Sequence, residues 1–228
     1  MKEDSIPNPQ ETSRPNLMIS MLVVAVFFSM ASRAIFSPLM PSLQSELGIT
    51  LSTVGTLFLI VSVSYAASML FSSFLAAYIG YGMTIVAALA LITVGLFLSA
   101  ISPDIVVLAL GMFLIGAGAG AYPPSGLVMI NTKISVQRRS TAFSFHEIGP
   151  NLALLLAPLL VLMVEPWFGW RGVLFCLAAV CGLASFAFLR LAAADSGVGT
   201  SPDLSTLGII LRLRSTYVGM VLLSAALA

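Results

Sequence analysis

Long apolar runs alternate with short polar links along this chain. Six runs have about the 20 consecutive apolar residues that a helix needs to cross a bilayer core of about 30 Å. Because apolar positions follow one another instead of alternating with polar ones, they predict membrane helices rather than the strands of a barrel. The six predicted spans are residues 17–39, 52–78, 83–100, 105–130, 141–163 and 172–191.

Polar segments flank these six spans. Residues 1–16 form a polar tail, and residues 192–215 form a loop that is polar at first and then basic. Residues 216–228 begin a seventh apolar run that is too short to cross a bilayer. We therefore expect an all-α membrane protein, in which residues 17–191 form a six-helix transmembrane bundle. A central loop and an incomplete seventh helix would follow, as in a chain that stops partway through a larger protein.

Basic residues gather on one side of the predicted bundle. Loops rich in Lys and Arg stay in the cytoplasm, so the bias predicts a cytoplasmic N-terminus and a multi-pass protein of the cell (inner) membrane. Arg171 is the only basic residue in the links of the other side. The cytoplasmic group consists of Lys2, Arg14, Lys133, Arg138, Arg139, Arg190, Arg212 and Arg214.

Composition agrees with this topology and narrows the function. Hydrophobic residues make up 59% of the chain and charged residues 8%, whereas a soluble domain carries about 25% charged residues. The net charge of +1 gives no sign of nucleic-acid binding. Cys176 and Cys181 fall in one apolar run and suggest no disulfide framework. The sequence has no nucleotide-binding loop, so ATP is not expected to drive the protein, and no enzymatic activity or cofactor is predicted.

Arg33 lies inside the first predicted span. Ser29, Arg33 and Ser37 are four residues apart, so they share one helix face that would border a wet cavity. A guanidinium keeps its charge and offers a planar pair of donors to a carboxylate or phosphate, which makes Arg33 a candidate anion anchor. The alternatives are a structural arginine paired with backbone carbonyls or with Glu147, or a side chain that reaches the outer interface.

The fifth span begins with the only histidine of the chain, followed by a glutamate. Glu147 and Asn151 share one helix face and His146 and Pro150 share another, so one member of the pair at most faces a cavity squarely. Pro150 leaves the carbonyl of His146 without its helical partner and favours a bend there. Both ionisable groups suit proton coupling. The alternative is an interfacial pair that balances the basic residues nearby.

Two tyrosines and a set of glycines complete the candidates. Tyr65 in the second span and Tyr122 in the fourth could line a cavity and, with Asn151, contact a solute. Gly116 and Gly120 form a GxxxG motif, which more often lets helices pack closely than binds a substrate. The sequence HEIGP resembles half of a zinc-binding HExxH motif, but the chain contains no second histidine, so no metal site is expected.

Four segments in order resemble the N-terminal half of a Major Facilitator Superfamily transporter: SPLMPSLQSELGIT, FLIGAGAGAYPPSG, QRRSTAFSF and GWRGVLF. The resemblance covers about residues 17–191. It implies two six-helix bundles around a midplane cavity, worked by rocking of one half against the other. The partner of this chain would then be a missing C-terminal six-helix half, or a second copy.

The chain departs from that family pattern at several points. The loop between the second and third spans keeps Gly80 but lacks the usual charges, and Met112 stands where many members have an arginine. The span-five signature of drug–proton antiporters is absent. We therefore predict a secondary active transporter, a symporter or antiporter, for a small organic anion or zwitterion. The alternatives are a truncated or accessory membrane protein without transport of its own, and a drug-efflux antiporter.

Overall fold

A computed structural model describes residue 12 and residues 14–192. Over these residues the chain is helical and contains no strand, which confirms the predicted all-α class. The predicted central loop (192–215) and incomplete seventh helix (216–228), like most of the N-terminal tail, lie outside the described residues, apart from residue 192 itself.

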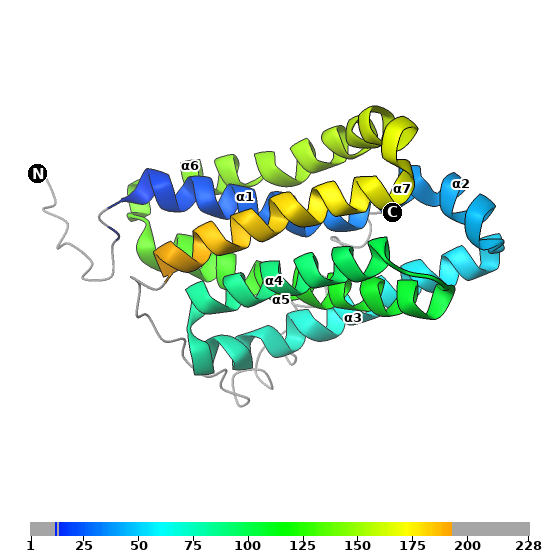
Figure 1. Cartoon of the computed structure of the whole chain (residues 1–228). Coiled ribbons are helices and arrows are strands. Elements are labelled where there is room, and N and C mark those ends of the chain that lie inside the picture. The colour runs from blue at the N-terminus through cyan, green and yellow to red at the C-terminus, as the bar shows by residue number, and fades with distance from the viewer. Residues whose placement is uncertain (1–11, 13, 193–228) are drawn as a thin grey trace, which may run out of the picture.

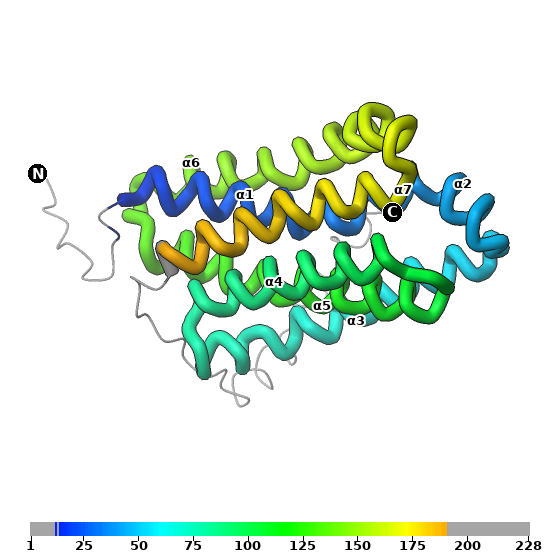
Figure 2. Tube along the Cα trace, viewed as in Figure 1, coloured from blue at the N-terminus to red at the C-terminus, as the bar shows by residue number. Residues whose placement is uncertain are grey.

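The helices form an elongated bundle with two groups, as Figures 1 and 2 show. One group contains α3 (Leu51–Ile79), α4 (Tyr81–Ala100) and α5 (Ile105–Lys133). The other contains α1 (Pro15–Ala34) and the two arms of α7 (Ile148–Ala192). Contacts of α1 with α5 and of α4 with α7 join the groups. Segments far apart in the sequence therefore meet along the whole bundle axis.

The first apolar run is longer than predicted and is interrupted. After α1 the chain continues through Ile35 into α2 (Phe36–Leu47), so a predicted span of residues 17–39 becomes a helical stretch of 33 residues. Pro38 explains the interruption, because a proline has no N–H for the carbonyl four residues earlier and its ring crowds that carbonyl. Gly48 then ends α2 with a φ of 62°, in the left-handed region that favours glycine.

The next three helices match their predicted spans with extended ends. Thr50 begins α3 by accepting a hydrogen bond from the backbone N–H of Thr53 at 3.3 Å. Asp104 begins α5 in the same way, accepting from the N–H groups of Val106 and Val107 at 2.9 and 3.0 Å. Such capping satisfies backbone donors that have no partner within the helix.

The last two predicted spans form one helical stretch that folds back on itself. It begins with α6 (Val136–His146) and continues through α7, and residues 136–190 of this stretch number 55, more than twice what one crossing needs. Gly169, with φ of 64° and ψ of −179°, breaks α7 into two arms that run in opposite directions. Among the described residues there are thus five apolar stretches, and the fifth contains predicted spans five and six.

Glycines on two faces of α5 bring its backbone against two neighbours. A Cβ added at Gly116 or Gly120 would meet the carbonyl oxygens of Val61 or Tyr65 in α3, at 2.4 and 2.1 Å. On another face, a Cβ at Gly118 would lie 2.6 Å from the carbonyl oxygen of Ala88 in α4. The GxxxG motif therefore serves close helix packing, against the second predicted span.

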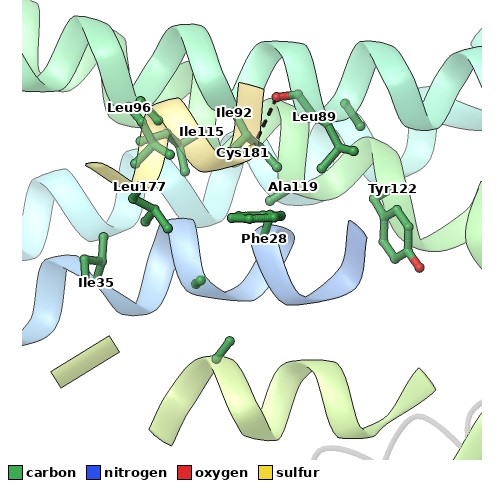
Figure 3. Close-up of a cluster of buried hydrophobic side chains, with 14 of the residues drawn as sticks. Phe28, Ile35, Leu89, Ile92, Leu96, Ile115, Ala119, Tyr122, Leu177 and Cys181 are labelled. Atoms are coloured by element: carbon green, nitrogen blue, oxygen red, sulfur yellow. Dashed lines mark hydrogen bonds between the residues drawn. The ribbon is translucent and has the colours of Figure 1, made fainter. Parts of the chain in front are cut away.

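A buried apolar cluster fills the space where the two groups meet (Figure 3). Phe28 of α1 lies beside Ala119 of α5, and Leu177 of the second α7 arm faces the same region. The thiol of Cys181 contacts the carbonyl oxygen of Leu89 in α4 at 3.7 Å. Tyr122 lies at the edge of this cluster, with its hydroxyl directed away from it.

Polar contacts tie the links together at the end of the bundle where α7 turns. The carboxylate of Glu46 in α2 pairs with Arg171 and accepts a hydrogen bond from the indole N–H of Trp170 at 2.7 Å. Arg171 also donates to the carbonyl of Ser102, between α4 and α5, at 3.0 Å. Trp170 is buried, whereas Trp167 is exposed, as an indole at a membrane interface would be.

Candidate functional site

The guanidinium of Arg33 lies halfway along the helical stretch formed by α1 and α2, half-buried between α1 and α3. Its Nε donates to the carbonyl oxygen of Ser29 at 3.2 Å, and its Nη2 lies 3.5 Å from the sulfur of Met30. The guanidinium carbon stacks 4.4 Å from the centre of the Tyr65 ring. The bond to a backbone carbonyl agrees in part with a structural arginine, but it uses one of five donors.

The remaining donors of Arg33 are what a binding role requires. Among the described residues, no carboxylate forms an ion pair with Arg33, and Glu147 pairs with His146 instead. The two N–H groups of Nη1 and one of Nη2 have no protein acceptor in this part of the chain. These donors lie on the edge through which an arginine can bind a carboxylate by two parallel hydrogen bonds.

Two serines predicted to share a face with Arg33 differ in environment. Ser29 is buried, and its hydroxyl donates to the carbonyl of Ala119 in α5 at 3.2 Å. Ser37 is exposed one turn beyond Arg33. The Ser29 hydroxyl thus joins α1 to α5, whereas Ser37 lies in α2, beyond the interruption at Ile35. A solute-binding role for either serine stays a prediction.

The ring of Tyr65 is held in place by the close contact of α3 with α5. Gly120 lies against the backbone of Tyr65, so no side chain separates the two helices at this level. The aromatic face under the guanidinium stabilises the cation and orients its plane. Arg33 of α1 and Tyr65 of α3 therefore form one unit.

A second polar cluster joins α1, α5 and the α6–α7 junction. The hydroxyl of Tyr122 lies 2.8 Å from the carbonyl oxygen of Leu22 and 2.9 Å from Nε2 of His146. Tyr122 is 1% exposed and His146 is 5% exposed, so both lie inside the bundle. The Tyr122 ring also stacks in parallel with the imidazole. The carbonyl of Leu22 is a member of this cluster that sequence analysis did not identify.

Glu147 and Asn151 lie on the exposed side of the same junction. The Nδ1 atom of His146 is 3.3 Å from a carboxylate oxygen of Glu147, whose side chain is 68% exposed. Asn151 donates to the carbonyl oxygen of Glu147 at 2.7 Å. The helix is interrupted at Glu147, between α6 and α7, as Pro150 predicts. As expected from the helical spacing, one member of the acid–base pair is buried and the other is exposed.

Gly149 brings this junction against α1. A Cβ at Gly149 would lie 2.8 Å from the carbonyl oxygen of Val23 and 2.5 Å from a methyl group of Val26. The site around His146 is thus fixed to α1 near Leu22. Leu22 precedes Arg33 by three turns, or about 16 Å along the helix. Among the described residues no cluster of His, Cys, Asp or Glu could hold a metal ion.

Known proteins resemble both the sequence and this architecture. The profile of the Major Facilitator Superfamily matches residues 22–228. "Probable plastidic glucose transporter 2" of Arabidopsis thaliana is 30% identical over 78% of this chain and 38% of its own length. A "Uridine/deoxyuridine transporter" of Lactococcus lactis is 26% identical over 61% of this chain and 29% of its own length. A "Probable sulfoacetate transporter" of Cupriavidus necator is 22% identical over 75% and 40%.

Solved structures show the same fold at lower identity. The crystal structure of a peptide transporter in complex with alafosfalin superposes with a TM-score of 0.70, at 21% identity, over 96% of this chain and 48% of that one. The same transporter in complex with sulfate gives a TM-score of 0.65 at 20% identity, over 96% and 47%. The chain therefore spans about half the length of these structures, and less of the curated relatives. On the match of the profile to most of its length, this chain belongs to the Major Facilitator Superfamily, a family of membrane transporters rather than enzymes.

Proposed function

We propose that this chain forms the solute-binding N-terminal half of a secondary active transporter for a small organic anion or zwitterion. It would work by alternating access with a second six-helix half, supplied by a longer chain or by a second copy. The observation that carries the proposal is the half-buried guanidinium of Arg33, whose paired outer donors meet no acceptor among the described residues. A cation in a membrane bundle without a protein counter-ion favours a ligand of opposite charge.

The surroundings of Arg33 support a site for a carboxylate or a similar anion. The Tyr65 ring covers one face of the guanidinium, and the bond to Ser29 holds its inner edge. The plane of the side chain is thus fixed, while the outer donors meet no acceptor among the described residues. Preorganisation of this kind lowers the entropy lost on binding. A zwitterion would place its carboxylate here and its cationic group against the other half.

The relatives give partial support for the charge of the solute. Sulfoacetate, named for one relative, is an organic anion, and one of the similar structures is a complex with sulfate. Glucose and uridine, named for the other two relatives, are neutral. Arg33, and not the solutes of these relatives, is therefore the feature that favours an anion.

We further propose that His146 and Glu147 couple transport to protons. The pair lies at a helix interruption, which is where transporters bring ionisable groups to a cavity. A buried histidine next to an exposed carboxylate can exchange a proton with that side of the bundle. In this arrangement Arg33 binds the solute and the pair responds to pH.

The basic loops support a cytoplasmic N-terminus in the cell membrane.

The anion proposal is tested by replacing Arg33 in the full-length transporter. Arg33→Gln should weaken binding of carboxylates by about 10- to 150-fold, because hydrogen bonds to a charged group contribute about 1.5–3 kcal/mol. Arg33→Lys should restore part of the affinity, since an ammonium keeps the charge without the planar pair of donors. Isothermal titration calorimetry or ligand-induced thermal shifts with small carboxylic and sulfonic acids would measure this.

Arg190→Gln is the matched control. Arg190 also stacks on an aromatic ring, 4.8 Å from the centre of Phe186, but it is exposed near the end of α7. Its replacement should leave affinity unchanged. Unchanged binding in Arg33→Gln would overturn the proposal and favour a neutral solute. Binding of many apolar cations would favour drug efflux, and no binding in the wild type would favour an accessory role.

A further inference from the structure

The Tyr122 hydroxyl has two partners, and one of them is unable to donate. A backbone carbonyl accepts hydrogen bonds only, so the bond of 2.8 Å to Leu22 takes the single proton of the hydroxyl. The contact of 2.9 Å with His146 Nε2 then needs a proton from the imidazole. Nε2 therefore carries a hydrogen in every protonation state that keeps both contacts.

This leaves Nδ1 as the position at which His146 gains and loses a proton. Nδ1 lies 3.3 Å from a Glu147 oxygen, and one proton between them keeps the contact favourable. The pair is then neutral overall, either as imidazolium with carboxylate or as imidazole with carboxylic acid. Loss of that proton leaves a lone pair on Nδ1 facing a carboxylate with a net charge of −1, so the contact becomes repulsive.

The other charged groups near the junction do not compete for this position. Arg138 of α6 donates to the side chain of Asn16 at 2.6 Å, and Arg139 donates to the carbonyl of Ile134 at 3.0 Å. Among the described residues, the titratable side chains that contact His146 are Tyr122 from α5 and Glu147 from the α6–α7 junction. The carbonyl of Leu22 is the polar group that α1 contributes through Tyr122.

We infer that Tyr122 is a positioning residue that holds His146 in its Nε2–H form, so that the His146–Glu147 pair takes up a single proton from the exposed side. The inference deepens the proposed function and rests on it for its role in transport, although the tautomer itself does not. The buried hydroxyl does not relay the proton. When the proton leaves, Glu147 is the partner that moves away, because it is exposed and His146 is held on its other side.

A spectroscopic test is direct because His146 is the only histidine in these 228 residues. The chain, purified without a histidine tag and labelled with ¹⁵N-histidine in nanodiscs, should give one pair of imidazole nitrogen signals. At a pH where the imidazole is neutral, the protonated nitrogen should be Nε2 and the unprotonated one Nδ1. A neutral form that is mainly Nδ1–H would overturn the inference.

Variants test whether Tyr122 is the cause. Tyr122→Phe should abolish the preference and give a mixture of tautomers, whereas Tyr65→Phe removes a hydroxyl elsewhere and should leave the signals unchanged. Unchanged tautomers in Tyr122→Phe would overturn the positioning role. If Tyr122→Phe fails to fold, Glu147→Gln serves instead: an amide donating to Nδ1 should keep the Nε2–H form, and a switch to Nδ1–H would contradict the inference.

Transport measurements separate this inference from the function on which it depends. In the full-length protein, Tyr122→Phe should change the pH profile of uptake, with little change in solute affinity at fixed pH. An Nε2–H tautomer in a protein whose uptake ignores the pH gradient would overturn proton coupling while leaving the positioning role intact. A changed affinity with an unchanged pH profile would instead indicate a merely structural tyrosine.

Discussion

Arg33 lies on α1 and His146 ends α6, where Tyr122 links it to Leu22 about three turns before Arg33, and the hydrogen bonds of the two residues are used in opposite ways. Arg33 keeps a permanent charge, and three of its five donors have no acceptor among the described residues. His146 has a partner at each ring nitrogen, and only the proton at Nδ1 is variable. A fixed charge with unused donors suits recognition of a ligand, whereas a titratable group with fixed partners suits exchange of one proton.

The two regions are held by different contacts, so each should be open to disruption without the other. The largest effect is expected at Gly120. In Gly120→Leu the new side chain would meet the backbone of Tyr65, whose carbonyl oxygen lies 2.1 Å from the Cβ position. Over-packing costs about 1–3 kcal/mol, and we expect the upper end because backbone and not a flexible side chain is in the way. Thermal stability should therefore fall most in this variant, and anion binding should fall by up to about 30-fold as Tyr65 moves from Arg33, while the ¹⁵N signals of His146 keep their tautomer.

Gly55→Leu is the control for that experiment. Gly55 is in α3 as well, but nothing lies within 4 Å of its Cβ position, so thermal stability and binding should change little. Equal losses in the two variants, measured by thermal unfolding and calorimetry in the same detergent, would show that the close contact at Gly120 does not support Arg33.

The next effect concerns Glu147 and should leave binding intact. Glu147→Gln removes the carboxylate that shares a proton with His146, so uptake should no longer follow the pH gradient. For one coupled proton, accumulation should fall by about tenfold for each pH unit of gradient, the equivalent of about 1.4 kcal/mol. Exchange of labelled for unlabelled solute should persist, because Arg33 is unchanged. Proteoliposome uptake with an imposed gradient would measure both, and gradient-driven accumulation in the variant would contradict coupling at this pair.

The smallest effect is expected at the ring of Tyr65. A cation–π contact contributes about 0.5–2 kcal/mol depending on solvent exposure. Tyr65→Leu should therefore weaken anion binding by about 2- to 30-fold. Tyr65→Phe keeps the aromatic face under the guanidinium and should bind like the wild type in the same titration. An equal loss in Tyr65→Phe and Tyr65→Leu would show that the hydroxyl, and not the aromatic face, supports binding.

Sequence patterns predicted the helices well because each crossing must satisfy its own backbone hydrogen bonds. Each of the six predicted spans lies in a helix, although the structure joins the fifth and sixth in one of five apolar stretches among the described residues. The GxxxG motif predicted the close approach of α5 to a neighbour. Sequence patterns missed the helical extension of the first run to Leu47. They also missed the interruption near Ile35, which Pro38 explains.

The candidate site was less accessible to sequence reasoning. Helical spacing placed His146 and Glu147 on different sides of one helix, as the structure has them. The bonds of Tyr122 join residues 24 and 100 positions apart, so no local pattern indicates them. The sequence suggested that Tyr122 could line a cavity, whereas the structure buries its hydroxyl between α1 and the α6–α7 junction. The pairing of Glu46 with Arg171 is distant in the same way.

The bare backbone of α5 has a mechanical consequence for any movement of this half. At Gly116, Gly118 and Gly120 the main chain of α5 lies against main-chain atoms of α3 and α4, with no α5 side chain between them. Sliding one of these helices along another would first require separating main chains that are already in contact. The helices α3, α4 and α5 should therefore move as one rigid body, so that a displacement at one end reaches the other end.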